Sequence, residues 1–259
     1  MILPFQKLPE GKKIYFVSDF HLGVPDFASS LKREKKIVRW LSEIEKDAAA
    51  IFLMGDVFDF WFEFKYVIPK GFVRLQGKLA AITDNGIPVY WFTGNHDMWI
   101  FDYFTKEFNI QIFRDTETFQ LNDKKFLIGH GDGLGPGDKF YKFIKKIFGN
   151  RFFQEWFRIT PASIGLGIAN YWSKSSRISG LKKEVYLGEK EWLYIYSKEQ
   201  EALSHHDYYI FGHRHIPLDI EIGPSSRYIN LGEWVNYFTY AVFDGNTVKL
   251  TDYEKDFIE

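Results

Sequence analysis

Five short apolar runs of this 259-residue chain each end, within one to three residues, in side chains that can bind a metal. The runs and the polar residues that follow them are Ile14–Val17 with Asp19 and His21, Ala50–Met54 with Asp56, Val89–Phe92 with Asn95, His96 and Asp97, Phe126–Ile128 with His130 and Asp132, and Tyr208–Phe211 with His213 and His215. Runs of this kind are typical of buried strands. Because ligands of open α/β sheets bind beyond the carboxyl ends of the strands, we expect these side chains to converge on one spot.

The chemical types of these residues predict a metal centre with nitrogen and oxygen ligands. The candidate ligands are Asp19, His21, Asp56, Asn95, His130, His213 and His215. Carboxylate, imidazole and amide oxygen suit Mn²⁺, Fe²⁺, Zn²⁺ or Co²⁺, and the absence of cysteine excludes thiolate sites. Seven ligands are too many for one tetrahedral ion but suit two ions that share a carboxylate. Two ions roughly 3.5–4 Å apart can hold a bridging hydroxide and clamp a phosphoryl group.

The elements between the motifs predict an α/β fold with crossover connections. Apolar residues recur at helical spacing from Ser29 to Glu45 and from Phe72 to Ile82, and the second helix is followed by a turn at Asn85-Gly86. Strands alternating with helices imply a largely parallel sheet near the N-terminus. Asn122-Asp123 is expected to join a hairpin, and further strands are expected at Tyr228–Leu231 and Tyr240–Phe243.

The segment 138–196 differs in character from the rest of the chain. It lacks strand alternation and carries an aromatic stripe at helical spacing that runs from Phe140 to Phe157, with Lys and Arg beside it. We interpret it as a helical cap inserted into a single domain of residues 1–259 and packed over the strand ends. The lysines of the stripe are expected to be solvated rather than engaged in binding. His205-His206 is expected to be an exposed helix end without a functional role.

The composition restricts the partners and the location of the protein. The formal net charge of −1 gives no basic field that would attract nucleic acid. No secretory signal is visible, and no run approaches the roughly 18 apolar residues of a membrane span, so a cytoplasmic protein is expected. Aromatic residues make up 19% of the chain. Dense core packing would explain part of that fraction, and a pocket for an apolar ligand would explain the rest.

The five motifs, in their order along the chain, resemble those of the calcineurin-like metallophosphoesterases. The motifs are Asp-x-His, Gly-Asp-x-x-Asp, Gly-Asn-His-Asp, His-Gly-Asp and Gly-His-x-His. The resemblance implies a β-sandwich flanked by helices, which gives four layers, and a dinuclear metal site. It also implies that Asp19, His21, Asp56 and His215 bind one ion, and that Asp56, Asn95, His130 and His213 bind the other, with Asp56 bridging.

The same resemblance makes His96 a catalytic candidate. Its imidazole could stabilise charge on the phosphoryl oxygens or protonate the leaving group, with Asp97 orienting the ring. The alternative is that His96 only supports the metal ligands. Asp59 is expected behind the ligands or at the edge of the core, and Asp132 is expected to bond backbone groups behind His130.

Within that family, the chain is most similar to the UDP-2,3-diacylglucosamine diphosphatases of lipid A synthesis. The similarity rests on Asp56-Val-Phe-Asp-Phe-Trp61, on His130-Gly-Asp-Gly-Leu134 followed by Asp138, on Ile168-Ala169 with Ser176 and Lys183, and on Arg227 to Trp234. It implies that Asn95, His96, Asp138, Ser176 and Lys183 contact the UDP-sugar. The chain departs from the best-known form of the enzyme, which has Arg in place of His96.

The resemblance implies an enzyme that cleaves UDP-2,3-diacylglucosamine to UMP and 2,3-diacylglucosamine 1-phosphate. A hydroxide that bridges two divalent ions, with Mn²⁺ expected first, would attack the α-phosphorus. Two alternatives are another nucleotide diphosphate or a phosphodiester as substrate, and a non-catalytic lipid or nucleotide binder. Basic residues beside the aromatic stripe could also touch the anionic inner membrane surface as a peripheral contact.

Overall fold

The computed structural model describes residues 3–137, 139–159 and 185–253. The helices are α1 (Phe27–Ile44), α2 (Val73–Asp84), α3 (Tyr103–Phe108), α4 (Lys139–Phe148), α5 (Arg151–Ile159), the 3₁₀ helix η1 (Gly188–Lys190) and α7 (Trp192–Leu203). The strands are β1 (Lys13–Val17), β2 (Ala48–Leu53), β3 (Val89–Phe92), β4 (Gln111–Phe113), β5 (Glu117–Leu121), β6 (Lys124–Gly129), β7 (Tyr208–Phe211), β8 (Pro217–Glu221), β9 (Arg227–Leu231), β10 (Thr239–Phe243) and β11 (Val248–Asp252).

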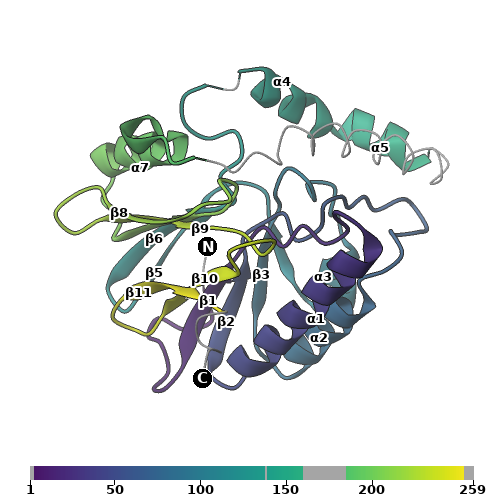
Figure 1. Ribbon diagram of the computed structural model, residues 1–259, viewed down its shortest axis with the longest axis horizontal. Coiled ribbons are helices and arrows are strands. Elements are labelled where there is room, and N and C mark those ends of the chain that lie inside the picture. The colour runs from purple at the N-terminus through teal and green to yellow at the C-terminus, as the bar shows by residue number, and fades with distance from the viewer. Residues whose placement is uncertain (1–2, 138, 160–184, 254–259) are drawn as a thin grey trace.

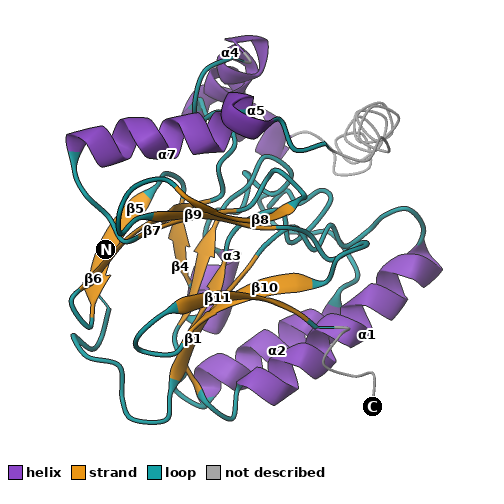
Figure 2. Ribbon diagram, turned by 60° about the vertical axis from the view of Figure 1, so that its left-hand side comes forward, coloured by secondary structure: helices purple, strands orange, loops and turns teal. Residues whose placement is uncertain are grey.

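Two sheets form the centre of the molecule, with helices on both outer faces (Figure 1). The first sheet has the order β11-β10-β1-β2-β3-β4, and β1 to β4 are parallel in it. The second sheet has the order β5-β6-β7-β9-β8, with β6, β7 and β9 parallel. Figure 2 shows α1 and α2 beside the first sheet and α7 above the second. The expected four-layer α/β sandwich is therefore confirmed.

The sheets meet in a core made largely of stacked aromatic rings. Phe52 stacks on Phe16 at 5.0 Å between centroids and on Phe119 at 5.6 Å, and Phe119 stacks on Phe126 at 4.5 Å. All four rings are buried. Burying one such side chain contributes roughly 1.5–3 kcal/mol, and an aromatic pair adds about 0.5–1.5 kcal/mol. This packing accounts for part of the high aromatic content, as expected.

Two of the sequence-predicted elements show why the chain turns where it does. The expected hairpin forms between β5 and β6, with Asn122 and Asp123 in left-handed backbone conformations at its turn. The first predicted helix forms as α1, and the Asp26 side chain caps its start by accepting from the N–H of Ser29 at 2.9 Å. Glu34 of α1 accepts from the N–H groups of Arg74 and Leu75, which satisfies free donors at the start of α2.

The expected cap segment contains helices of two kinds. Helices α4 and α5 lie above one end of the sandwich in Figures 1 and 2. Helix α7 instead packs on the second sheet, where Leu193 joins a buried cluster with Tyr209 and Phe211. The predicted end of the cap, at residue 196, therefore falls inside a helix that covers the sandwich. None of the helices in the described ranges has the length and apolarity that a bilayer crossing requires.

One predicted surface feature is wrong in part. His205 is exposed after the end of α7, as expected, but His206 is buried at 5% exposure. Its Nδ1 lies 2.8 Å from the carbonyl oxygen of Ser204 and 3.2 Å from the hydroxyl of Tyr209. Burial accordingly lowers the pKa of His206. The sequence places both histidines after a helix, but only the packing of α7 on β7 turns one of them inward.

Candidate metal centre

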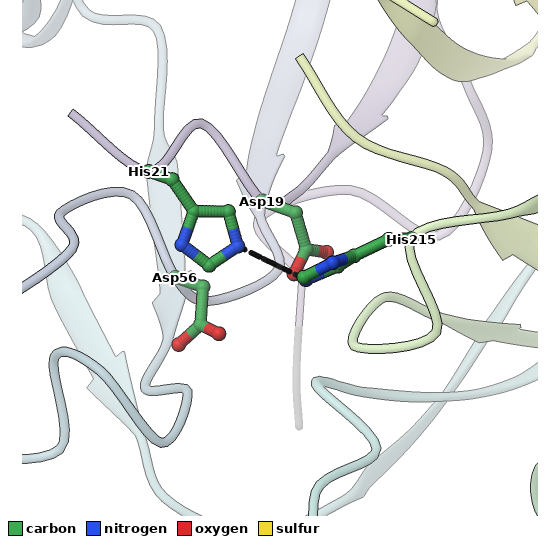
Figure 3. A group of neighbouring side chains, drawn as sticks. All are labelled: Asp19, His21, Asp56 and His215. Carbon is green, nitrogen blue, oxygen red and sulfur yellow. Dashed lines mark hydrogen bonds and ion pairs between the residues drawn. The ribbon is translucent and has the colours of Figure 1, made fainter. Parts of the chain in front are cut away.

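Five loops, which follow β1, β2, β3, β6 and β7, bring the predicted ligands together at one end of the sandwich. We call them the strand-end loops, and they comprise residues 18–22, 55–59, 94–98, 130–132 and 212–215. Four predicted ligands lie with their ligand atoms within 4.8 Å of one another, namely Asp19, His21, Asp56 and His215 (Figure 3). A second group with the same spacing comprises Asp56, His130 and His213. Asp56 belongs to both groups, as a bridging carboxylate would.

In the first group, the two imidazoles and one carboxylate face the same point. His21 Nε2 lies 3.0 Å from His215 Nε2, and Asp19 Oδ1 lies 3.2 Å from His215 Nε2 and 3.6 Å from His21 Nε2. Asp19 Oδ1 is fully buried and accepts no hydrogen bond of good geometry. A buried carboxylate oxygen in that state, facing two imidazole nitrogens, is the arrangement expected for a cation site. The donor set therefore fits a divalent metal.

In the second group, His130 is held by a backbone contact on its far side. Its Nδ1 donates to the carbonyl oxygen of Met54 at 2.7 Å, so that Nε2 faces Asp56 Oδ2 at 3.3 Å. The Asn95 amide oxygen lies 3.4 Å from the same Nε2, which places Asn95 beside this group. A hydrogen bond to the outer ring nitrogen is the usual way in which proteins aim a metal-binding histidine.

The backbone of the strand-end loops is strained at the candidate ligands. Asp19, His21, Asp56, His213 and His215 all have positive φ angles. Non-glycine residues adopt this region rarely, at a cost of about 1–3 kcal/mol each, and such strain concentrates at functional sites. Hydrogen bonds between the loops maintain it: the N–H of His213 donates to Asp19 Oδ2 at 3.0 Å, and the N–H of His21 donates to the carbonyl oxygen of Asp56 at 3.0 Å.

Two glycines let these loops approach one another closely. A Cβ atom on Gly94 would lie 2.1 Å from Asp56 Oδ1, and one on Gly212 would lie 2.5 Å from Asp19 Oδ2. Neither glycine has a positive φ, so the requirement is space rather than backbone conformation. Gly94 and Gly212 therefore serve the contact between ligand loops, whereas Gly55 and Gly131 of the motifs also have positive φ angles.

The charges at the centre are strongly coupled. Burial opposes ionisation of Asp56, but the neighbouring His130 and His96 outweigh it and hold its pKa below the usual value. Burial likewise disfavours the cationic form of His130, but Asp56 raises its pKa to about 10. Burial and then the charge of His130 lower the pKa of His213 to about 4. Asp56 thus favours the charged form of His130, whereas burial and His130 favour the neutral form of His213.

The structure corrects the expected partner of His96. The His96 ring donates from Nδ1 to the backbone carbonyl oxygen of Asp59 at 2.8 Å, and the Asp59 carboxylate lies 4.0 Å away. Asp97 does not orient this ring, because its carboxylate accepts from the N–H of Gly94 at 2.7 Å and from that of Val57 at 3.0 Å. Asp97 therefore ties two strand-end loops together. Asp59 is buried, and its carboxylate forms a further group with His21 and His96, whose ligand atoms lie within 4.8 Å of one another.

One supporting residue, Arg33, has no signal in the sequence motifs. Arg33, on the buried side of α1, donates to the carbonyl oxygen of His21 at 2.7 Å and fixes the first strand-end loop from behind. Its position among the charged residues of an amphipathic helix gave no reason to place it at the site. Its basic type at a position that helical periodicity turns inward was the one available clue.

Two lysines of α4 make specific contacts, contrary to the expectation that they are merely solvated, whereas Lys146 is exposed as expected. Lys145 Nζ lies 2.6 Å from Asp132 Oδ2 and donates to the Asp132 carbonyl oxygen at 3.0 Å. Lys142 Nζ donates to the carbonyl oxygen of Gly135 at 2.5 Å. Asp132, expected to bond backbone groups, pairs with Lys145. The two lysines attach α4 to the loop that follows His130.

Aromatic contacts attach the other side of α4 and α5 to the centre. Trp99 Nε1 donates to the carbonyl oxygen of Phe148 at 3.2 Å, and Phe157 packs on Phe62 at 4.6 Å between ring centroids. The predicted substrate contacts Asp138, Ser176 and Lys183 lie outside the described residues.

Comparison with known proteins agrees with the geometry. The family model for calcineurin-like phosphoesterases matches residues 12–217. The chain belongs to this family. As a member it is a hydrolase, and the family implies divalent metals, for which this phosphoesterase has a suitable Asp and His cluster.

The phosphoesterase is similar to three bacterial proteins named UDP-2,3-diacylglucosamine hydrolase. It is 38% identical to the protein of Porphyromonas gingivalis, over 93% of this chain and 98% of that one. It is 30% identical to the protein of Proteus mirabilis, over 85% of this chain and 90% of that one. It is 27% identical to the protein of Neisseria meningitidis, over 94% and 99%. The similarity therefore covers nearly the whole length of these relatives.

Proposed function

We propose that this phosphoesterase hydrolyses UDP-2,3-diacylglucosamine to UMP and 2,3-diacylglucosamine 1-phosphate by cleaving the bond at the α-phosphorus. The observation that carries the proposal is the 38% identity, over nearly the full length of both chains, to a relative named UDP-2,3-diacylglucosamine hydrolase. The buried cluster of carboxylates and imidazoles supports it, because pyrophosphate cleavage needs concentrated positive charge beside the phosphoryl oxygens.

The geometry supports two metal positions with a shared ligand. Asp19, His21, Asp56 and His215 would hold one ion, and Asp56, Asn95, His130 and His213 would hold the other. Two bound divalent ions would activate water and offset the negative charge of the phosphoryl group. Mn²⁺ is our first choice, because carboxylate-rich sites with imidazoles suit it, although Fe²⁺, Zn²⁺ and Co²⁺ suit the same donors.

His96 is our candidate for the residue that acts on the substrate. Its ring lies edge-on to that of His21, 5.0 Å away between centroids, and about a quarter of its side chain is exposed. Burial favours the neutral ring, but Asp56 and Asp59 outweigh it and raise the pKa of His96. We assign His96 the stabilisation of phosphoryl charge or the protonation of the leaving group. Asp97 supports this role indirectly by holding the loop that carries His96.

The apolar face of α4 and α5 suits the acyl chains of the proposed substrate. Its exposed side chains are Phe143, Phe152, Phe153, Trp156 and Ile159. Each buried CH₂ of an acyl chain gains about 0.8 kcal/mol, so even a shallow apolar surface would add affinity. The exposed Arg151 beside this face suits a peripheral contact with an anionic membrane. Asp138, Ser176 and Lys183 remain our candidates for contacts with the UDP-sugar.

The test is incubation of the full chain with UDP-2,3-diacylglucosamine and Mn²⁺, with release of UMP as the measurement. A metal-free sample is the control, and UDP-N-acetylglucosamine, which lacks the second acyl group and has no long chains, is the comparison substrate. We expect UMP only from the metal-loaded sample and faster release from the acylated sugar. No UMP above the metal-free control would reject the assignment.

A second reaction is favoured by His96 itself. A histidine that can donate a proton also suits the cleavage of simpler phosphodiesters or other nucleotide diphosphates. If bis(p-nitrophenyl) phosphate or a dinucleotide were cleaved faster than the lipid, this second reaction would replace the first. A non-catalytic binder would keep its ligand affinity when Asp56→Asn removes the shared carboxylate charge.

A further inference from the structure

The residue between two predicted metal ligands takes part in a buried ion pair. Arg214 stands between His213 and His215, and its guanidinium reaches Glu191 with Nε at 2.6 Å from Oε1 and Nη2 at 3.2 Å from Oε2. Glu191 has no exposed surface, and the Arg214 side chain is 12% exposed. A two-pronged guanidinium–carboxylate contact fixes both side chains in direction as well as in distance.

Glu191 is a rigid anchor because it belongs to the start of α7. Its N–H donates to the carbonyl oxygen of Gly188, and its own carbonyl oxygen accepts from the N–H of Ile195 at 2.9 Å. Two residues later, Leu193 is buried against the second sheet. The Arg214 guanidinium also lies over the ring of Trp192, 5.6 Å from its centroid. The loop after β7 is thereby attached to an element packed on the sandwich.

The loop that Arg214 belongs to needs such an anchor. His213 and His215 both have positive φ angles, which a free loop would relax away from. At the start of the loop, the N–H of Gly212 donates to the carbonyl oxygen of His130, and Asn230 Nδ2 donates to the carbonyl oxygen of Gly212 at 2.6 Å. These bonds hold the start of the loop, whereas the Arg214 contact holds its middle.

We propose that Arg214 and Glu191 form a positioning pair, which holds His213 and His215 so that each imidazole faces a different metal position. The proposal rests on the metal centre of the proposed function but not on the identity of its substrate. Because neither Arg214 nor Glu191 belongs to a ligand group, the loss of their contact should act through the histidines. Loss of such a supporting contact typically weakens metal binding about 10–100-fold.

The test is titration of the metal-free full chain with Co²⁺. The visible absorption of the bound Co²⁺ is measured during the titration and reports both affinity and ligand geometry. We expect Glu191→Gln and Arg214→Gln to bind Co²⁺ about 10–100-fold more weakly and with altered absorption bands. Arg214→Lys keeps the charge but not the two-pronged contact, so it should fall between these variants and the wild type. Arg227→Gln, which breaks the Arg227–Asp219 pair of β8 and β9, is the matched control and should leave both readouts unchanged.

The outcomes separate this inference from the proposed function. Unchanged affinity and absorption in Glu191→Gln and Arg214→Gln would overturn the positioning role. If Glu191→Gln or Arg214→Gln has a melting temperature well below that of the wild type in the absence of metal, the test rests on Arg214→Lys. Wild-type Co²⁺ affinity and absorption in Arg214→Lys would then overturn the proposal. Weaker, altered Co²⁺ binding in the variants supports it even if the wild type releases no UMP from the lipid. A wild type that takes up no Co²⁺ overturns both proposals.

Discussion

The strand-end loops and the pair of helices α4 and α5 invert the usual distribution of side chains. The loops bury charged groups, since Asp19, Asp56 and His130 are almost fully enclosed. The helices expose apolar groups, since Trp156 is 62% exposed and Phe152 is 74% exposed. Buried charges in proteins are normally paired or bind metals, and large exposed apolar patches normally mark binding surfaces. We therefore expect each region to bind a ligand, cations at the loops and an apolar group at the helices.

The two regions also differ in how firmly they are held. Backbone hydrogen bonds connect the strand-end loops to one another, as between the N–H of Asp19 and the carbonyl oxygen of Gly55 at 3.0 Å. Helix α4 is attached mainly through side chains, among them Lys142 and Lys145. Rigid loops suit a site where ligand positions must hold within fractions of an ångström. Side-chain attachment suits a surface that adapts to flexible chains.

The largest effect is expected where the two ligand groups share a residue. Asp56→Asn keeps the shape of the side chain but removes the charge that both groups use. Loss of several kcal/mol of transition-state stabilisation would lower kcat by roughly 10³-fold or more. Measurement of UMP release and of bound metal per chain checks this, with the melting temperature of the metal-free variant as the control. Near-normal kcat together with a full metal complement would contradict a shared carboxylate.

A smaller but still large effect is expected from crowding the loops. Gly94→Ala would bring a Cβ to 2.1 Å from Asp56 Oδ1, so the loop must shift by about 1 Å. A misplacement of that size can lower activity by roughly 10²-fold. The matched control is Gly77→Ala in α2, where nothing lies within 4 Å, and which should stabilise the helix by about 1 kcal/mol. Equal activity in both variants would show that the close approach is not required.

The apolar helices should matter for the lipid only. Trp156→Ala removes exposed apolar area on α5, so we expect KM for the acylated substrate to rise roughly tenfold, which corresponds to about 1.4 kcal/mol. Activity toward UDP-N-acetylglucosamine or a soluble phosphodiester should be unchanged. Leu203→Ala, at an apolar position on α7 that is even more exposed, is the control. If Trp156→Ala lowered activity on the soluble and the acylated substrates by the same factor, Trp156 would support the metal centre instead.

The smallest effect concerns stability far from the centre. Burial disfavours the charged form of Glu201, but hydrogen bonds from His205, Ser226 and Tyr209 outweigh it and lower its pKa to about 2. A lowered pKa stabilises the fold above the usual Glu pKa of about 4.5, and this contribution is lost as the pH falls toward 2. Urea unfolding should show Glu201→Gln about 1 kcal/mol less stable at pH 7, with the difference shrinking toward pH 3. A difference that stays constant with pH would contradict the ionised role of Glu201.

Local sequence patterns were enough to predict most of the central strands and the side chains that cluster beyond their ends. Each predicted strand is a short apolar run, and each candidate ligand lies just beyond its end, where parallel strands place their loops at one edge. The aromatic stripe likewise predicted the helices α4 and α5. In these cases, the information lies within a few neighbouring residues, and the periodicity of helix and strand is enough to read it.

Only the tertiary structure decided which residues support the ligands. Asp59 rather than Asp97 contacts the His96 ring, Lys145 pairs with Asp132, and Arg214 pairs with Glu191. Such partners lie 13 to 37 residues apart along the chain. Their pairing depends on how helices dock on the sheets and how the loops bend, which no local pattern encodes. The sequence by itself therefore determined which chemical groups are available at the centre, whereas long-range packing determined how those side chains are oriented.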